Sequence, residues 1–168
     1  ILGAHAVGTE GAARRIAVIA TAIAGGITAS APSRLELAYA PQFGSAKDPV
    51  NQLGYVAEGR ANGSSPAVQW HQLESELAAG ALLVDVRSEG EFARDTIPGA
   101  TNIPVDNLRE RFGELTGRRV IVHCQVGQRG HTATRLLRQL GIDASNLDGG
   151  FLTWKAGVGA TATAVLEG

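Results

Sequence analysis

The stretch "RRVIVHCQVGQRGHTATRLLRQLG", residues 118–141, decides the fold class of this 168-residue chain. Its first part, residues 118–124, contains the apolar run "VIV" and is typical of a strand that is buried on both faces of a parallel sheet. Residues 129–141 follow as a predicted helix that ends at Gly141. The only cysteine, Cys124, therefore stands between a buried strand and a helix, at the carboxyl end of the strand.

The same alternation of strand and helix extends to both sides of that stretch. Ser88 is the predicted N-cap of one helix, with Glu91 at the capping-box position. The predicted strands are residues 81–87, 101–104 and 144–150, and the predicted helices are residues 68–80, 88–95, 106–115 and, as a helical turn, 151–157. Strands that alternate with helices over about 100 residues predict an α/β fold, a parallel sheet flanked by helices.

The first 57 residues carry weaker signals. A short strand is predicted over residues 1–8 and a helix over residues 14–24. A helical opening is predicted at residues 35–38, and a further helix begins at Pro49 with Asp48 as its N-cap. So little regular structure is not expected to form a core alone.

A change in composition separates the two parts of the chain. The segment "EGRANGSSP", residues 58–66, is rich in Gly, Ser and Asn and is typical of a linker. The predicted organisation is residues 1–57, the linker 58–66, an α/β domain at 67–157 and a tail at 158–168.

Composition and charge exclude several functions. With 15 basic and 16 acidic side chains the net charge is −1, which argues against a nucleic-acid partner. The apolar run within residues 14–31 is too short and too rich in glycine to span a bilayer, so no membrane role is expected. A single cysteine fits a reducing compartment, and we expect a cytoplasmic protein. Because the chain has no methionine, even at position 1, it is expected to be part of a longer protein.

Cys124 stands where an α/β sheet binds ligands, beyond the carboxyl end of a strand. Loop N–H groups and the start of the following helix would point at one spot there and favour the thiolate. Gly127 and Gly130 can supply the positive φ angles of a tight loop, and Arg129 adds a fixed cation. A buried structural cysteine is the simpler alternative, but it needs neither the glycines nor Arg129. We therefore predict that Cys124 is a nucleophile.

The length of the loop bears on what Cys124 attacks. The spacing from Cys124 to Arg129 is C-x-x-x-x-R, one residue shorter than the loop of cysteine phosphatases, so the cradle fits a sulfane sulfur better than a phosphoryl group. Asp85 and Asp95 are the available acids, but nothing in the sequence directs them at a leaving oxygen. Phosphatase or arsenate-reductase chemistry stays as a minor alternative.

Three ordered motifs resemble the rhodanese domain: "LLVDVRSEGEFARDTIPGATNIP", "VIVHCQVGQRG" and "NLDGGFLTWKAG". The resemblance implies a rhodanese-like fold in which Cys124 carries sulfur as a persulfide. It also implies that Asp85 and Arg87 orient neighbouring loops by ion pairing. The persulfide cradle that the resemblance implies consists of Gln125, Val126, Gly127, Gln128 and Arg129. Arg129 is expected to be catalytic together with Cys124, and Gly130 to be a further substrate-binding residue.

Two positions depart from the rhodanese pattern. Asp95-Thr96 replaces a usual Gly-His pair, so the local loop is expected to differ. His131 stands where an aromatic residue is frequent, and we expect it to face solvent. No metal site is expected, because His123 and Cys124, as neighbours on a strand, point to opposite faces.

Residues 1–57 resemble the carboxyl-terminal dimerisation region of pyridine nucleotide-disulfide oxidoreductases, an α+β domain that would here be partial. The motifs are "ILGAHAVGTEGAARRIAVIATAI" and "LELAYAPQFGSAKDPVNQLGYVA". Coenzyme A disulfide reductases and NADH-dependent persulfide reductases carry such a fusion. The resemblance implies a homodimeric parent with FAD, NAD(P)H and coenzyme A, and Tyr39 as a possible residue of its active site. We expect no cofactor in this chain, which lacks a G-x-G-x-x-G motif.

The expected function is that of a rhodanese-type sulfurtransferase. Its sulfur donors would be thiosulfate, a polysulfide or a persulfide, and the acceptor a thiol or a fused flavin reductase. A non-catalytic module that only binds or tethers sulfur near a separate reductase is the alternative from another functional class.

Overall fold

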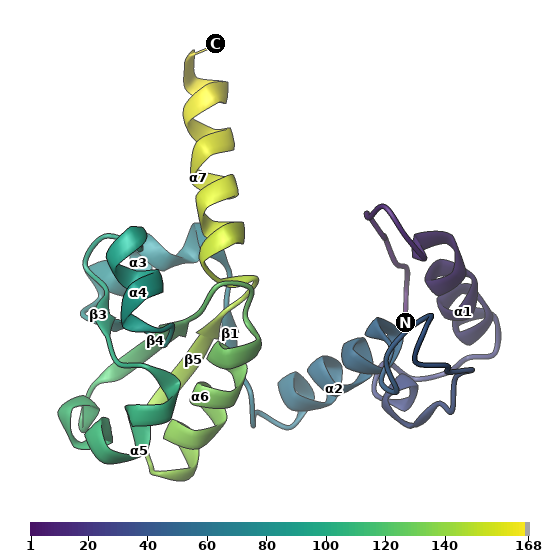
Figure 1. Ribbon diagram of the computed structural model, residues 1–168, viewed down its shortest axis with the longest axis horizontal. Coiled ribbons are helices and arrows are strands. Elements are labelled where there is room, and N and C mark those ends of the chain that lie inside the picture. Colours follow the sequence, from purple (N-terminus) through teal and green to yellow (C-terminus); the bar gives the residue numbers. More distant parts are fainter. Residues whose placement is uncertain (167–168) are drawn as a thin grey trace. The chain divides into compact units, whose positions relative to one another are not determined.

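The computed structural model describes residues 1–166, and the side chains up to residue 160. The chain consists of two compact units, residues 1–63 and 64–168 (Figure 1). The candidate site lies in the second unit.

The second unit is built on a five-stranded sheet in which all neighbouring strands are parallel. The strands are β1 (Ala67–Val68), β2 (Leu82–Asp85), β3 (Thr101–Asn102), β4 (Arg119–His123) and β5 (Asp143–Leu147). Their order is β1-β5-β4-β2-β3, so β4 is the central strand. The predicted α/β fold with a parallel sheet is confirmed.

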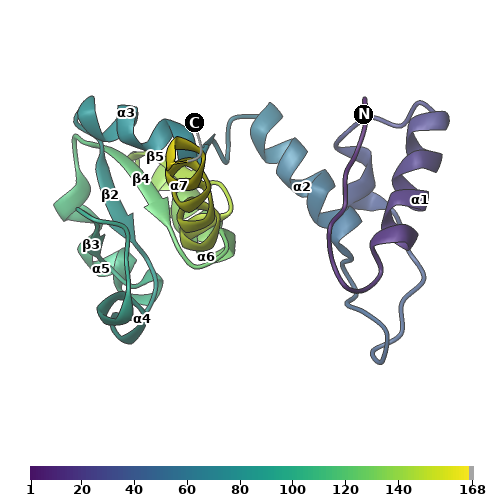
Figure 2. The same cartoon turned by 90° about the horizontal axis from the view of Figure 1, so that it is seen from above.

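Helices cover both faces of this sheet (Figures 1 and 2). They are α3 (Leu73–Ala78), α4 (Glu89–Arg94), α5 (Leu108–Arg111), α6 (Gln128–Gln139) and α7 (Gly150–Leu166). On one face Leu108 of α5 and Leu137 of α6 pack over Val120 and Val122 of β4. On the other face Leu73 of α3 and Phe151 of α7 pack near Ile121. Alternate β4 side chains thus enter two separate cores, as a fully buried strand requires.

The parallel arrangement brings several strand ends to one edge of the sheet. Asp85 at the end of β2 is paired in register with His123 at the end of β4. Cys124 follows His123 directly, and β5 ends beside them at Leu147. The side chains that the sequence singled out after β2 and β4 therefore meet at this carboxyl edge.

Two predictions for the second unit were wrong. Residues 67–68 form β1, although Val68 was assigned to the following helix; β1 exists only because it pairs with β5, far away in sequence. Residues 106–115 do not form one amphipathic helix. They form α5 flanked by two 3₁₀ turns, Val105–Asn107 and Phe112–Leu115, in which Leu108 and Leu115 are buried.

The first unit contains the helices α1 (Ala12–Ala24) and α2 (Pro49–Ala61). Asp48 caps α2 and accepts a hydrogen bond from the Val50 N–H, as predicted. Residues 1–8 form no strand, because no neighbouring strand is present in residues 1–63 to satisfy the backbone.

Two boundaries in the first unit also differ from the prediction. The helical turn predicted at residues 35–38 instead lies at Ala31–Arg34, where Pro32 occupies its first turn. Helix α2 continues to Ala61 and so includes residues 58–61 of the predicted linker. In the part of the chain that the structure describes, none of the helices is both long and apolar enough to cross a bilayer.

Candidate functional site

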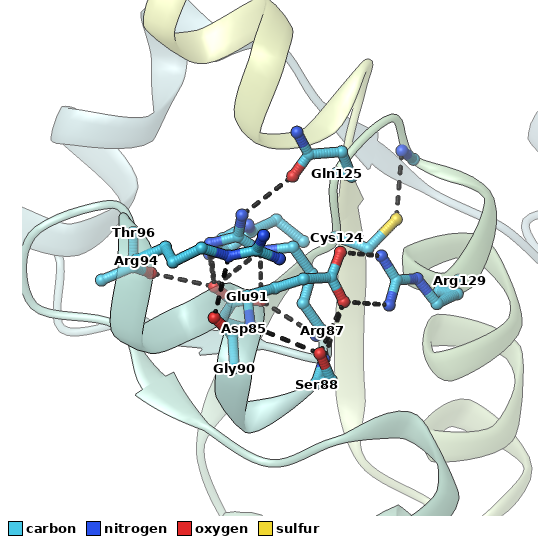
Figure 3. Close-up of polar contacts among 12 residues, drawn as sticks. Asp85, Arg87, Ser88, Gly90, Glu91, Arg94, Thr96, Cys124, Gln125 and Arg129 are labelled. Carbon is cyan, nitrogen blue, oxygen red and sulfur yellow. Dashed lines mark hydrogen bonds and ion pairs between the residues drawn. The ribbon is translucent and has the colours of Figure 1, made fainter.

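Cys124 is the first residue of the loop that joins β4 to α6. Its side chain is buried, with 1% of the residue exposed, and the Gly127 N–H donates a hydrogen bond to Sγ at 3.2 Å (Figure 3). Gly127 adopts a φ of +98° and caps the start of α6. This positive φ turns the loop back so that a backbone N–H points at the sulfur, as in an anion-binding cradle.

The start of α7 holds this loop from behind. The Phe151 N–H donates to the Cys124 carbonyl at 2.8 Å, and the Leu152 N–H donates to the Gln125 carbonyl at 3.1 Å. Gly150 has a φ of +63°, and a Cβ there would lie 2.9 Å from the Gly127 nitrogen and overlap the Cys124 carbonyl oxygen. The close approach therefore requires glycine at position 150.

Replacing Gly150 by alanine is expected to lower the free energy of unfolding by several kcal/mol, because overpacking adds about 1–3 kcal/mol to the cost of a left-handed alanine. Gly117 is the matched control: its φ is +72°, yet a Cβ there would meet no atom within 4 Å. Gly117→Ala should lose only the backbone cost, about 1–2 kcal/mol. Urea unfolding of both variants measures the difference, and equal losses would contradict this role of Gly150.

Arg129 forms an ion pair with Glu91 of α4 across the mouth of the loop. Both Nη1–Oε2 and Nη2–Oε1 are 2.7 Å (Figure 3). The hydrogen bonds from Arg129 lower the pKa of Glu91 to about 2. The contact with Glu91 raises the pKa of Arg129, with a smaller contribution from Cys124 beside it. Arg129 is thus a permanent cation next to the sulfur.

Glu91 is a site residue that the sequence interpretation missed, because it was assigned only to helix capping. It does cap α4: the Ser88 N–H and Oγ both donate to Glu91 Oε2, at 3.0 and 2.9 Å. Its helix starts at the end of β2, on the same sheet edge as Cys124. That placement is the signal by which the pair with Arg129 could have been predicted.

Asp85 and Arg87 form a buried ion pair at the base of the site. Their side chains are 0% and 3% exposed, and Arg87 Nη2 lies 2.7 Å from Asp85 Oδ2. Burial alone would raise the pKa of Asp85, but the Arg87 hydrogen bonds, the neighbouring His123 and Thr96 together lower it. Asp85 is therefore ionised, and its negative charge is paired with the Arg87 guanidinium.

Arg87 links three segments around the loop. Its Nη1 donates to Gln125 Oε1 at 2.8 Å, its Nη2 to the Asp95 carbonyl at 2.6 Å, and its guanidinium lies 4.5 Å from the centre of the Phe151 ring. Thr96 Oγ1 donates to Asp85 Oδ2 at 2.9 Å, which gives the substituted Asp95-Thr96 pair a place in the same network (Figure 3). Arg87 thus contacts both the Cys124 loop and the Asp95 segment, and the loop-orienting role of Asp85 and Arg87 stays a prediction.

The remaining loop residues differ in their surroundings. Val126 and Gln128 are exposed at the rim, and Val126 is 60% exposed. Gly130 does not have the predicted positive φ, because it already belongs to α6. Its small size serves packing instead: a Cβ there would overlap Oδ1 of Asn146 on β5.

Neither histidine near the loop lies with Cys124 in a shared site. His123 is fully buried, its Nε2 lies 3.6 Å from Asp85 Oδ2, and burial lowers its pKa. His131 is only partly exposed, whereas a solvent-facing side chain was expected: its Nδ1 lies 2.7 Å from Ser65 Oγ, and partial burial, with the nearby charge of Arg135, lowers its pKa. Among the described residues, no group of three side chains suited to a metal ion occurs.

The two aspartates considered as acids for phosphatase chemistry are both engaged. Asp85 is held by Arg87, and Asp95 Oδ2 lies 2.6 Å from Lys155 Nζ. The Lys155 hydrogen bond lowers the pKa of Asp95. Neither carboxylate is therefore placed to donate a proton to a leaving oxygen.

Tyr39 belongs to the first unit. It is 53% exposed and lines a small pocket together with Arg14 and Asp48. Its role in the active site of a longer protein stays a prediction.

Comparison with known proteins gives a family match and close relatives. The family model described as "Rhodanese-like domain" matches residues 69–157. The human thiosulfate:glutathione sulfurtransferase is 38% identical over an alignment of 107 positions, and the match covers 54% of this chain and 93% of that protein.

Two solved structures are similar over more than the second unit. The reduced CoADR-RHD of Bacillus anthracis shares 41% identity, with a TM-score of 0.82 over 86% of this chain. A NAD-dependent persulfide reductase from A. fulgidus shares 34% identity, with a TM-score of 0.73 over 84% of this chain. Residues 64–168 alone cannot supply such coverage, so the similarity extends into residues 1–63. The chain spans only 26% and 25% of the two solved chains.

Proposed function

Because the chain belongs to the rhodanese-like domain family through residues 69–157, we propose that it is a sulfurtransferase in which Cys124 carries sulfane sulfur as a persulfide. The observation that carries the proposal is the Gly127 N–H directed at Cys124 Sγ at 3.2 Å, beside the Arg129 guanidinium. Preorganised donors of this kind favour an anionic sulfur without reorganisation during the reaction.

The reaction is a double displacement. The Cys124 thiolate attacks the outer sulfur of thiosulfate, the S–S bond of the donor breaks, and sulfite leaves with the bonding electron pair. An acceptor thiolate then attacks the outer sulfur of the Cys124 persulfide, and the Cys124 thiolate leaves. The N–H groups of the loop and Arg129 stabilise the charge on sulfur in both steps.

The longer relatives suggest a setting for this activity. We propose that the intact protein is a homodimer in which this chain delivers sulfur to a reductase using FAD, NAD(P)H and coenzyme A, with Tyr39 in the reductase site. The support is the similarity to CoADR-RHD and to the persulfide reductase, which reaches into both units of the chain. The activity of the sulfur-loading loop does not depend on this setting.

Turnover tests the proposal against its rivals. Purified protein incubated with thiosulfate and glutathione should release sulfite over many cycles per Cys124. A module that only tethers sulfur would release no more than one equivalent. Hydrolysis of an aryl phosphate in place of sulfite release would favour the phosphatase alternative, and the engagement of Asp85 and Asp95 in ion pairs predicts none.

A further inference from the structure

A groove of about 570 Å³ lies between α6 and the segment that leads from β3 into α5. Its floor includes Val105 and Leu136, which pack on the core beneath. Its rim is polar and consists of Asp106, Arg109, His131, Thr132, Arg135 and Gln139. The volume and the combination of an apolar floor with a few polar groups suit a small-molecule site.

Two cations of this rim are not used by the fold. Arg109 and Arg135 are exposed, and neither forms an ion pair with any side chain of residues 1–160. Arg87, Arg119 and Arg129 all pair with carboxylates. His131 and Arg135 are four residues apart on α6, so they lie on the same face of the helix, and both line the groove.

The groove and the candidate site share helix α6: Arg129 of the site and Thr132 of the groove both lie on it. Arg129, Thr132 and Leu136 follow one another at spacings of three and four residues, so they share one face of the helix. Arg129 stands beside Cys124, and Arg135 is six residues further on, about 9 Å along the helix axis. A molecule of peptide or nucleotide size is long enough to span this distance.

We propose that this groove binds the anionic groups of the small thiol that accepts sulfur from Cys124. Arg109 and Arg135 pair with its carboxylates or phosphates, because the guanidinium fork matches both groups. The apolar floor contacts the part of the molecule between its anions and its thiol. This inference rests on the proposed persulfide chemistry and adds the site that selects the acceptor.

In the transfer of sulfur the groove only binds the acceptor thiol and takes no part in the chemical step. The thiolate of the seated acceptor attacks the outer sulfur of the Cys124 persulfide, the S–S bond breaks, and its electron pair stays on Cys124 Sγ. Loading from thiosulfate should not need the groove, since that small dianion fits the cradle itself.

Arginine variants test the proposal with three acceptors. Glutathione carries carboxylates, coenzyme A carries phosphates, and 2-mercaptoethanol is uncharged. Arg109→Gln and Arg135→Gln should each lower kcat/KM about tenfold for whichever anionic thiol the groove fits, as expected for loss of a charge-assisted hydrogen bond, and leave 2-mercaptoethanol unchanged. The thiol with the larger loss identifies the carboxylate or the phosphate as the natural anion.

Arg138→Gln is the matched control on the same helix. It removes the same charge, but Arg138 already lies 3.7 Å from Asp143 Oδ1, so none of the three acceptors should be affected. The proposal is overturned if the groove variants slow 2-mercaptoethanol equally, or if they leave both anionic thiols unchanged.

A binding measurement separates the groove from the sulfur chemistry. The S-methyl derivatives of glutathione and coenzyme A cannot accept sulfur, and calorimetric titration should detect at least one of them with wild-type protein and neither with the Arg109→Gln, Arg135→Gln double variant. Binding that needs the arginines, in a protein that fails to load sulfur, would support the groove and reject the sulfurtransferase. No binding of either derivative to wild-type protein would overturn the groove.

Discussion

Replacing Cys124 by serine is expected to abolish sulfur uptake from thiosulfate and polysulfide. Cys124 is the only thiol of the chain, so no second cysteine can take over the sulfur. Intact mass before and after incubation should show the gain of one sulfur atom in wild-type protein and none in the variant. Addition of glutathione should then remove the gained sulfur from the wild-type protein.

The control for this experiment concerns folding. Cys124 is 1% exposed within the core between β4 and α6, and burying a more polar hydroxyl there costs up to about 1–3 kcal/mol even with the Gly127 N–H as a donor. Cys124→Ala avoids that polar group and should likewise take up no sulfur while unfolding cooperatively in urea. A mass gain that survives in a folded variant, or no gain in wild-type protein, would reject Cys124 as the sulfur carrier.

Much of the fold could be predicted because its signals are local. The apolar runs that became β2 and β4, the glycine that ends α6 and the Asp48 cap of α2 each depend on a few neighbouring residues. The errors lie where a contact with a residue distant in the sequence determines whether a strand forms. β1 needs β5 to pair with it, whereas residues 1–8 have no neighbouring strand in their unit and stay irregular.

The residues of the candidate site also divide into those that a local pattern predicts and those that a distant contact determines. Cys124, Gly127 and Arg129 could be predicted because one loop carries them all. The Glu91–Arg129 ion pair and the Arg87–Gln125 hydrogen bond each join residues that are 38 positions apart. A single sequence therefore identifies these residues but not their pairing. Gly130 was assigned to the turn, whereas its real constraint is the Asn146 side chain on another strand.

Replacing Asp85 by asparagine is expected to lower the free energy of unfolding by about 3–5 kcal/mol, because the variant leaves the charge of Arg87 buried without its counter-ion. Asparagine keeps the shape and one acceptor oxygen, so the loss measures charge rather than volume. Asp143→Asn is the control: this carboxylate also pairs with an arginine, Arg119, but is 60% exposed, and its loss should cost less than about 1 kcal/mol. Urea unfolding measures both variants.

A second substitution tests whether the unpaired charge of Arg87 causes the loss of stability. If the cost of Asp85→Asn comes from an uncompensated cation, then removing that cation as well, in the Asp85→Asn, Arg87→Leu variant, should restore part of the stability. Sulfur loading by the double variant should stay below that of the wild-type protein, because Arg87 also holds Gln125 of the loop at 2.8 Å. A double variant less stable than Asp85→Asn would mean that the hydrogen bonds of Arg87 matter more than its charge. Stability and loading that recover together would mean that the buried pair does not position the loop.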